Sequence, residues 1–428
     1  MKKYFALMLT ILLLASIFIT YIPVAASNPV TLRFSWWGDD TRHKATLEAI
    51  KLFEAKYPNI KIKPEYAGWT GYQDKQTTQI AGGTAADVMQ INWNWLPEYS
   101  RDGNGFYDLN QVAKEVGLEN FTKAMLDTGT VKGKLNAIPV ALTGRVFYFN
   151  KTIYDKFGVP VPKTWNDLLY APAKFAYGYY PIDLSAYDAW LLAMTYVEQR
   201  TGKQFISNDG KLVFTQDDIR VGLMFYKNLI DRKVAETIQV RTSEGGNSLT
   251  PVAQLPSFLD GKYAGIFEWT SAINKSASPL AEKKMEMVCG YLPKVAGFKD
   301  SGAIIKPSMM FAINKNCKYA KEAAMFLNFI LSDPAGAKAM GTNRGIPVSK
   351  AGLEALKAGG QITGLEYEGI QYLIANPGVQ LSPYTENAKL QSVYQQTIEQ
   401  LSYGKLNVDG AAKYMYDNVQ TVLKQIVK

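Results

Sequence analysis

The strongest constraint on the fold is an alternation of strand and helix patterns near the start of the chain. Leu32, Phe34 and Trp36 alternate with polar or small residues, which is typical of a half-buried strand. The pattern continues with a helix over residues 47–57, a strand over 60–66, a helix over 72–81 and a short buried strand over 87–91. Strand, helix, strand, helix and strand at this spacing predict a parallel sheet with right-handed crossovers.

The same alternation returns in the rest of the sequence. Strands are predicted over residues 145–149, 263–267, 288–292 and 309–313, and long amphipathic helices over 186–201, 216–231, 318–332 and 388–403. The 428 residues hold no internal repeat, no low-complexity tract and no long linker. Because a domain usually has about 100–200 residues, we expect two α/β lobes with short connections.

The first 26 residues have the pattern of a secretory signal. Two lysines precede an apolar stretch over residues 5–22, and Val24-Ala25-Ala26 supplies the small residues of a cleavage site. We therefore expect export to the periplasm or to the outer face of the cell membrane. The alternative is an uncleaved membrane anchor. A lipid-modified N-terminus is not supported, because no cysteine lies near the cleavage point.

Composition excludes several kinds of chemistry. His43 is the only histidine, so a histidine-rich zinc site cannot form and a catalytic triad would depend on this residue alone. His43 lies in a polar run at a predicted helix start, and we interpret it as a solvated helix residue. The formal charge of +9 falls by two to +7 without Lys2 and Lys3, and the remaining cations are dispersed. We therefore expect no nucleic acid partner.

The two cysteines, Cys289 and Cys317, leave two interpretations open. In an oxidising compartment a disulfide between them would stabilise the fold by about 3 kcal/mol. Two buried free thiols are the equal alternative. Neither interpretation is catalytic, because no histidine or basic cluster lies nearby in the sequence to activate a thiolate.

Four loops of the predicted fold combine aromatic with polar residues. In open α/β sheets, ligands bind where strands end and helices begin. These positions carry Trp36-Trp37-Gly38-Asp39-Asp40, Asn92-Trp93-Asn94-Trp95, Ser185-Ala186-Tyr187-Asp188-Ala189-Trp190 and Glu268-Trp269-Thr270. Aromatic rings pack against the apolar faces of a sugar, and Asp, Asn, Glu and Arg hydrogen-bond its hydroxyls. The loops therefore favour a sugar-binding site.

Several of these and neighbouring residues also have a structural interpretation. Trp36 is expected in the core because it shares a face with the apolar residues of its strand, and Trp165 is expected to pack at a helix start. Asp39 and Asp40 are equally suited to cap the helix that follows them. Arg344 is expected to be a solvated loop residue.

A series of short motifs occurs in one order along the chain. Leu47–Pro58 with Asn59-Ile60-Lys61-Ile62 follows the pattern F-E-x-x-Y-P-x-I-x-V, and Ile80–Val88 follows A-x-G-x-x-P-D-V with Ala86 in place of the usual proline. The later motifs are Gly133–Pro139, Phe149–Lys151, Pro162–Trp165, Phe258–Ala264, Phe311–Leu327 and Gly345–Val348. In this order they resemble the extracellular solute-binding proteins, family 1, which are the substrate receptors of ABC importers.

The resemblance implies an α/β fold of the type II periplasmic-binding-protein kind, with two discontinuous lobes joined by a hinge. Residues 27–140 with 306–350 would form lobe one, and residues 141–305 with 351–428 would form lobe two. The resemblance further implies a monomer that delivers an oligosaccharide to the transmembrane permease subunits of an ABC importer. It implies no enzymatic activity, no cofactor and no metal.

Carried over position by position, the resemblance gives a set of ligand-binding candidates. Trp269 would be a stacking platform, and Asp39 or Asp40 would accept hydrogen bonds from sugar hydroxyls. The full set is Trp37, Asp39, Asp40, Trp93, Asn94, Trp95, Arg145, Tyr187, Trp190, Glu268, Trp269 and Tyr384. The alternatives are a receptor for a non-sugar solute, such as a polyamine or a phosphate ester, and a secreted glycoside hydrolase, which needs two suitably spaced carboxylates.

Overall fold

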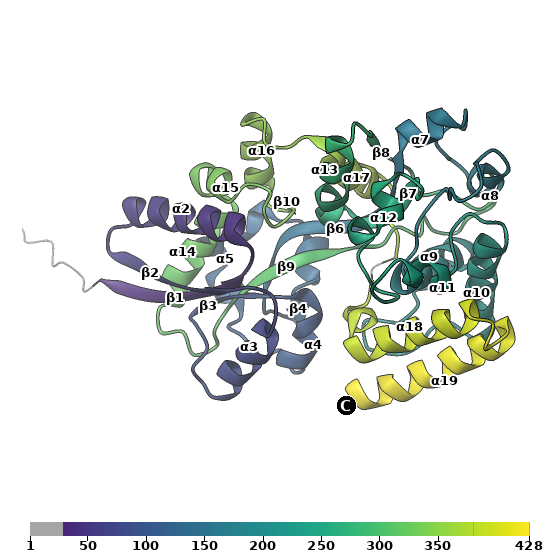
Figure 1. The fold of residues 1–428 in the computed structure, drawn as a ribbon. Coiled ribbons are helices and arrows are strands. Elements are labelled where there is room, and N and C mark those ends of the chain that lie inside the picture. The colour runs from purple at the N-terminus through teal and green to yellow at the C-terminus, as the bar shows by residue number, and fades with distance from the viewer. Residues whose placement is uncertain (1–28, 380, 428) are drawn as a thin grey trace, which may run out of the picture.

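The computed structural model describes residues 29–379 and 381–427, which form two bodies joined by long shared strands (Figure 1). We call the body at the start of the described chain lobe one, and the body with the C-terminal helices lobe two. The predicted signal over residues 1–26 lies outside the described residues. Within the described part of the chain, no helix is long and apolar enough to cross a membrane.

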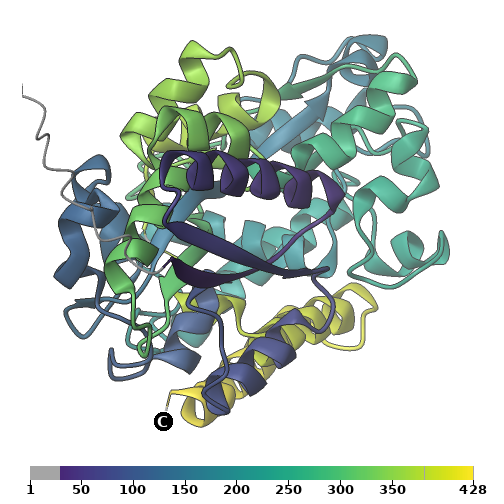
Figure 2. The same ribbon diagram turned by 90° about the vertical axis from the view of Figure 1, so that its left-hand side faces the viewer.

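Lobe one is built on the predicted parallel sheet. β1 (Val30–Trp37) lies between β2 (Ile60–Ala67) and β3 (Val88–Ile91) and pairs in parallel with both. The crossovers are α2 (Asp40–Lys56) and α3 (Tyr72–Ala81), which confirms the predicted alternation. These two helices lie on opposite sides of the sheet (Figures 1 and 2). Because Trp37 is paired with Ala67, β1 and β2 end at the same edge of the sheet.

Two strands run from lobe one into lobe two. β9 (Ile305–Ile313) pairs antiparallel with β3 and with the first half of β6 (Ile138–Asn150). That half of β6 also pairs with β10 (Ile346–Pro347), whereas its second half pairs with β7 (Gly265–Trp269) and β8 (Met287–Cys289). The sequence predicts only residues 145–149 of β6, because Pro139 and Gly144 interrupt the strand pattern before them. The lobe boundaries at residues 140, 306 and 350 stay predictions.

Four long helices form much of lobe two (Figure 1). They are α9 (Ala186–Thr201), α10 (Gln216–Asp231), α18 (Ala388–Ser402) and α19 (Val408–Ile426). The predicted bounds of α9 and α10 are confirmed. Each helix begins at a capping box, formed by Ser185 with Asp188 and by Thr215 with Asp218. α19 lies outside the predicted elements, although its buried residues recur at helical spacing.

Shorter elements connect these units, with 3₁₀ helices labelled η. In chain order the main ones are η2 (Trp93–Trp95), α4 (Leu96–Tyr99), η3 (Leu109–Val112), α5 (Ala113–Val116), η4 (Leu118–Asn120), α6 (Lys123–Asp127), β4 (Thr130–Val131), β5 (Lys134–Leu135), α7 (Lys151–Lys156), α8 (Trp165–Tyr170), η5 (Ala171–Ala173), α11 (Ile238–Ser243), η6 (Val252–Gln254), α12 (Pro256–Leu259), η7 (Thr270–Ala272), α13 (Ile273–Glu282), α14 (Ala320–Leu331), α15 (Pro334–Met340), α16 (Lys350–Ala358), α17 (Gly364–Ala375) and η8 (Pro383–Glu386). β4 and β5 form a separate hairpin.

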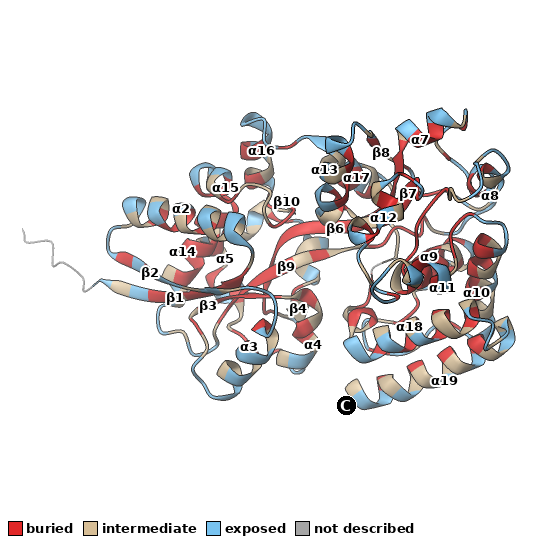
Figure 3. Ribbon diagram, in the orientation of Figure 1, coloured by how far each residue is buried: buried red, intermediate tan, exposed pale blue. Residues whose placement is uncertain are grey.

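The buried residues fill the interior of each lobe and the strands that the lobes share (Figure 3). Trp36 and Trp165 are buried, as predicted. Two other residues correct the prediction of a solvated side chain. His43 is half-buried, and its Nδ1 accepts a hydrogen bond from Nε1 of Trp36. Arg344 is buried, and its Nε donates to Oε1 of Gln90, which lies in β3.

Cys289 and Cys317 are both free thiols in the structure. Of the two interpretations left open by the sequence, the structure therefore agrees with two unpaired thiols and not with a disulfide. Burial raises the pKa of each thiol to about 12, so neither is a ready thiolate at neutral pH.

Candidate functional site

The candidate site lies where β6, β7 and β9 meet between the lobes. In the β6–β7 pair, Arg145 is opposite Trp269. The guanidinium carbon of Arg145 lies 4.8 Å from the centre of the Trp269 ring, and Nζ of Lys306, in β9, lies 4.5 Å from the same centre. The negative face of an aromatic ring attracts cations. The arrangement therefore places one large apolar surface directly beside two hydrogen-bond donors.

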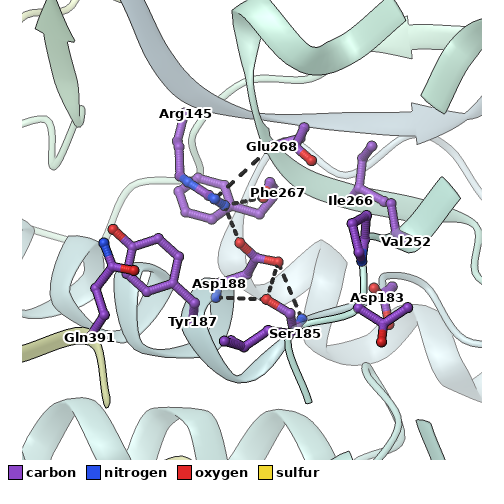
Figure 4. Close-up of a pocket in the computed structure, with 13 residues that line it drawn as sticks. Arg145, Asp183, Ser185, Tyr187, Asp188, Val252, Ile266, Phe267, Glu268 and Gln391 are labelled. Atoms are coloured by element: carbon purple, nitrogen blue, oxygen red, sulfur yellow. Dashed lines mark hydrogen bonds and ion pairs between the residues drawn. The ribbon is translucent and has the colours of Figure 1, made fainter. Parts of the chain in front are cut away.

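Arg145 is held in place by acceptors from α9 and β7. Its Nη1 lies 2.6 Å from Oδ1 of Asp188 and donates to the backbone oxygen of Phe267 at 2.5 Å (Figure 4). Its Nη2 lies 4.0 Å from Oε1 of Glu268, and the side chain is only 3% exposed. Burial lowers the pKa of Arg145, but the carboxylates of Asp188 and Glu268 outweigh that effect and the net direction is upward. The guanidinium therefore stays charged.

Asp188 is both a helix cap and the counter-ion of Arg145. Its Oδ2 accepts hydrogen bonds from the backbone N–H and the hydroxyl of Ser185, at 3.3 and 2.5 Å. Ser185 Oγ accepts in return from the backbone N–H of Asp188 at 3.2 Å. The capping box that starts α9 therefore aims the other carboxylate oxygen at Arg145. Burial raises the pKa of the neighbouring Glu268, and the positive charge of Arg145 opposes that rise.

A cavity of about 260 Å³ lies beside these charges. Its wall, shown in Figure 4, consists of Arg145, Asp183, Ser185, Tyr187, Asp188, Leu249, Thr250, Pro251, Val252, Ile266, Phe267, Glu268 and Gln391. Asp183 accepts two hydrogen bonds from the buried Arg241, at 2.8 and 3.0 Å. This end of the cavity is therefore polar, with its carboxylate already neutralised.

The two lobes touch next to this cavity. Asn94, in η2 of lobe one, donates from Nδ2 to the backbone oxygen of Glu386, in η8 of lobe two, at 3.1 Å. Gln391, from the cavity wall, donates to the same oxygen at 3.0 Å. The carboxylate of Glu386 forms a largely buried ion pair with Lys306. A connected series of contacts therefore runs from lobe one through Glu386 to the cation that lies against Trp269.

Three buried polar atoms of this region have no hydrogen-bond partner among the described residues. They are Nε of Arg145, the hydroxyl of Tyr187 and Oδ1 of Asn94. A buried polar atom left unpaired costs about 1–3 kcal/mol. Nε of Arg145 is a donor, Oδ1 of Asn94 is an acceptor, and the hydroxyl of Tyr187 can be either. A ligand that carries many hydroxyls can pair with all three, because a hydroxyl both donates and accepts hydrogen bonds.

The structure brings four of the predicted candidates together: Arg145, Tyr187, Glu268 and Trp269. Asn94 approaches this group from lobe one through its bond to Glu386. The ligand contacts of these residues stay predictions, because proximity alone does not test them.

Asp39 and Asp40 lie exposed at the start of α2. Asp39 is the N-cap, and its Oδ1 accepts from the backbone N–H of Arg42 at 2.9 Å. That hydrogen bond lowers the pKa of Asp39, and Lys275 of lobe two lowers it further. The helix-capping interpretation of Asp39 therefore holds, while its position also faces a cation across the cleft. A ligand role for either aspartate stays a prediction.

Four predicted tryptophans lie in the core. A ligand contact for Trp190 stays a prediction, although its side chain is fully buried. The physical reason for this burial is that α9 is a central helix of lobe two, covered by α10 and α18, and the Trp190 ring packs 5.8 Å from the ring of Tyr394. Trp37, Trp93 and Trp95 are only 6%, 2% and 3% exposed. Little of their surface is left for a ligand in this arrangement of the lobes.

Trp69 is a candidate that the prediction missed. It is 53% exposed in the loop after β2, and its ring stacks on that of Trp95 with 5.7 Å between centres and 17° between planes. The Trp37 ring lies 5.2 Å away. The sequence did contain a signal, since Gly68-Trp69-Thr70-Gly71 follows the second strand of the parallel sheet. Trp69 is therefore the accessible member of the tryptophan cluster of lobe one.

Lys306 and Glu386 were also missed, and for them no local signal exists. They are 80 positions apart in the sequence, and only the crossing of β9 between the lobes brings them together. Among the described residues, no group of three or more His, Cys, Asp or Glu side chains is placed to hold a metal ion.

Comparison with known proteins identifies the family. Residues 38–337 match the family described as bacterial extracellular solute-binding protein. The chain belongs to this family. A periplasmic solute binding protein from Pectobacterium atrosepticum is 36% identical to this solute-binding protein, with a TM-score of 0.86 over 93% of this chain and 100% of the other. A periplasmic oligogalacturonide binding protein from Yersinia enterocolitica, solved with saturated digalacturonic acid, is 35% identical, with a TM-score of 0.83 over the same shares.

Curated relatives of this solute-binding protein align over less of their length. The diacetylchitobiose binding protein DasA of Streptomyces coelicolor is 28% identical over 300 residues, which are 66% of this chain and 65% of DasA. Other curated relatives are 30% identical over 128 residues, so the aligned part of this chain spans 31% of their length. The structural similarity covers nearly the whole chain and confirms the predicted fold class, a two-lobed α/β periplasmic-binding-protein fold.

Proposed function

We propose that this solute-binding protein captures an oligosaccharide between its two lobes and delivers it to the transmembrane permease subunits of an ABC importer. The observation that carries the proposal is the ring of Trp269, with Arg145 and Lys306 against it. A sugar has an apolar face of C–H groups and an edge of hydroxyls. The Trp269 ring offers a surface for the apolar face, and the two cations offer donors for the hydroxyls. The oligogalacturonide and diacetylchitobiose relatives support the same class of ligand.

The charge pairing of the site favours a sugar over a polyamine or a phosphate ester. Arg145 and Lys306 each have a carboxylate partner, Asp188 and Glu386. A polyamine needs carboxylates that are still unpaired, and a phosphate ester needs unpaired cations. Paired cations instead act as fixed donors for neutral hydroxyls, and Glu268, which shares Arg145 with Asp188, supplies an acceptor.

Closure of the lobes would report that the site is occupied. A ligand that contacts both lobes shifts the equilibrium toward the closed arrangement by its difference in affinity for the two states. The Asn94–Glu386 hydrogen bond is one of the contacts that closure would form. A single cleft in a monomer is sufficient for this mechanism, and the permease subunits would recognise the closed form outside the cytoplasm.

The family consists of binding proteins, and we infer that this member releases its ligand unchanged. Fixed charge pairs and an aromatic platform bind and orient a sugar, and neither requires a cofactor. Turnover of an oligosaccharide by the purified protein would contradict this inference and favour the glycoside hydrolase alternative.

Intrinsic tryptophan fluorescence of residues 27–428 tests the proposal. The titrants are oligomers of galacturonate, N-acetylglucosamine and arabinose, with spermidine and glycerol phosphate as the alternative solutes. We expect a saturable change with one glycan class, and a loss of affinity of about tenfold in Trp269→Ala, since a stacked ring contributes about 0.5–1.5 kcal/mol beyond its buried area.

Tyr177→Ala is the matched control, because Tyr177 is fully exposed and does not line the cavity beside Arg145. Its affinity should equal that of the wild type. A response to spermidine or glycerol phosphate alone would replace the sugar by that solute. No response to any titrant, in fluorescence and in thermal shift alike, would refute the proposed ligand class.

A further inference from the structure

A second and larger cavity lies between the lobes. Its volume is about 560 Å³, within the range of about 300–1,000 Å³ that is typical of small-molecule sites. The first cavity, at about 260 Å³, falls below that range. The wall of the second cavity comes from both lobes: Trp93, Leu96, Pro97, Ser100, Arg101, Asp127, Thr128, Thr130, Val131 and Lys132 on one side, and Asn208, Asp209, Pro383, Tyr384, Ile426 and Val427 on the other. We call it the mouth chamber.

The contact between η2 and η8 lies near both the mouth chamber and the first cavity. Asn94 and Glu386 form that contact. Trp93 and Tyr384, which precede them in the two 3₁₀ helices, line the mouth chamber, whereas Gln391 lines the first cavity. In Figure 1, α4 and β4 lie on the side of lobe one that faces α18 and α19. Neighbours of the Asn94–Glu386 contact thus line both cavities.

The side chains of the mouth chamber are of the kinds that bind sugar rings. Tyr384 is half-buried and supplies an aromatic surface from lobe two. Hydroxyls of Ser100, Thr128 and Thr130 lie on the lobe-one side, and Asn208 lies on the lobe-two side. The hydroxyl of Ser100 donates to Asn136, and those of Thr128 and Thr130 donate to backbone oxygens, so these hydroxyl oxygens are left to accept hydrogen bonds from a ligand.

Four charged side chains line the mouth chamber: Arg101, Asp127, Lys132 and Asp209. Asp127 pairs with Lys123 at 2.6 Å, and Asp209 pairs with Lys211 at 2.7 Å. Lys132 has no ion-pair partner among the described residues. Its ammonium group is therefore free to donate to a ligand in the mouth chamber.

The backbone of Lys132 also departs from the usual chemistry of its turn. Lys132 and Gly133 connect β4 to β5 with φ of 51° and 80°. A two-residue turn with both φ values positive favours Asn, Asp or Gly at its first position. This left-handed conformation is strained for a lysine, and Lys233 and Lys284 adopt it outside the mouth chamber.

We propose that the mouth chamber is a second sugar subsite, which holds the distal rings of an oligosaccharide longer than two units while its first rings bind at Trp269. The inference rests on the proposed function. Tyr384 would pack against a ring from lobe two, and Lys132 would donate to its hydroxyls from lobe one. A long chain would then bridge the lobes at two places and favour closure more strongly than a disaccharide does.

Isothermal titration with a length series of the glycan that binds best, from two to five units, tests this subsite. For the wild type we expect affinity to rise at least tenfold between two and four units. Tyr384→Ala should remove most of that rise, with a much larger loss of affinity for the tetrasaccharide than for the disaccharide. Lys132→Gly should do the same, and because glycine relieves the positive φ, this variant is expected to fold at least as stably as the wild type.

Tyr403→Ala is the matched control, since Tyr403 is an exposed tyrosine that lines neither cavity. It should keep the full rise of affinity with length. Affinity that is independent of length would overturn the second subsite, as would an equal loss for disaccharide and tetrasaccharide in both variants. Two disaccharides bound per chain with independent affinities would overturn the continuous path. If no glycan binds at all, the proposed function itself fails, which is a different result from binding without length dependence.

Discussion

Asp188→Asn tests how much the counter-ion of Arg145 contributes to the stability of the folded protein. In the folded protein, Nη1 of Arg145 lies 2.6 Å from Oδ1 of Asp188, and the arginine side chain is 3% exposed. An asparagine has nearly the same shape but carries no charge. The substitution therefore removes the nearest negative charge from a buried guanidinium, with little change in packing.

The expected loss of stability has two parts. The first is the capping box, which contributes about 1 kcal/mol and which asparagine preserves only partly. The second is the charge. Glu268 remains at 4.0 Å from Arg145 and Asp188 is 23% exposed, so the loss is that of one charge-assisted hydrogen bond, about 1.5–3 kcal/mol. A fully uncompensated buried charge would cost about 3–5 kcal/mol.

Asp218→Asn is a close control for this experiment. Asp218 occupies the same capping-box position in α10, a helix of the same length, but its ion-pair partner Lys203 is 43% exposed. Urea denaturation at neutral pH should give a lower midpoint for Asp188→Asn than for Asp218→Asn at the same slope, with a difference of about 1–2 kcal/mol in the free energy of unfolding. Equal losses in the two variants would show that Asp188 acts only as a cap, and the argument about Arg145 would be wrong.

Two further predictions follow from buried titratable groups. Burial raises the pKa of Glu366 from 4.5 to about 7, so between these pH values the folded protein retains a proton that the unfolded chain has lost. The free energy of unfolding of the wild type, relative to that of Glu366→Gln, should therefore fall as the pH rises from 4.5 to about 7. A rise of this difference in urea denaturation would contradict the assignment. The thiols of Cys289 and Cys317, with pKa values of about 12, should react slowly with an aromatic disulfide reagent in the folded protein and fast in urea, whereas rapid reaction of the folded protein would show an accessible thiolate.

The sequence by itself determined the elements with strong local signals. α9 and α10 begin at capping boxes that start at Ser185 and Thr215. Each capping box is a pair of hydrogen bonds between residues of one four-residue segment. The parallel order of β1, β2 and β3 followed from the spacing of strand and helix patterns. Glu268 and Trp269 were found because an aromatic beside a carboxylate near the end of a strand is a local pattern, although they lie in β7 itself and not in the predicted loop after it.

Tertiary structure decided which of the predicted residues lie in the core and which lie at the cleft. Trp190 and Trp269 look alike in sequence, yet one lies inside the helical core of lobe two and the other beside two cations at the cleft. The ion pair of Lys306 with Glu386 joins residues 80 positions apart. Burial and long-range pairing depend on which elements pack together across the whole chain, and a local pattern of residues carries no information about that.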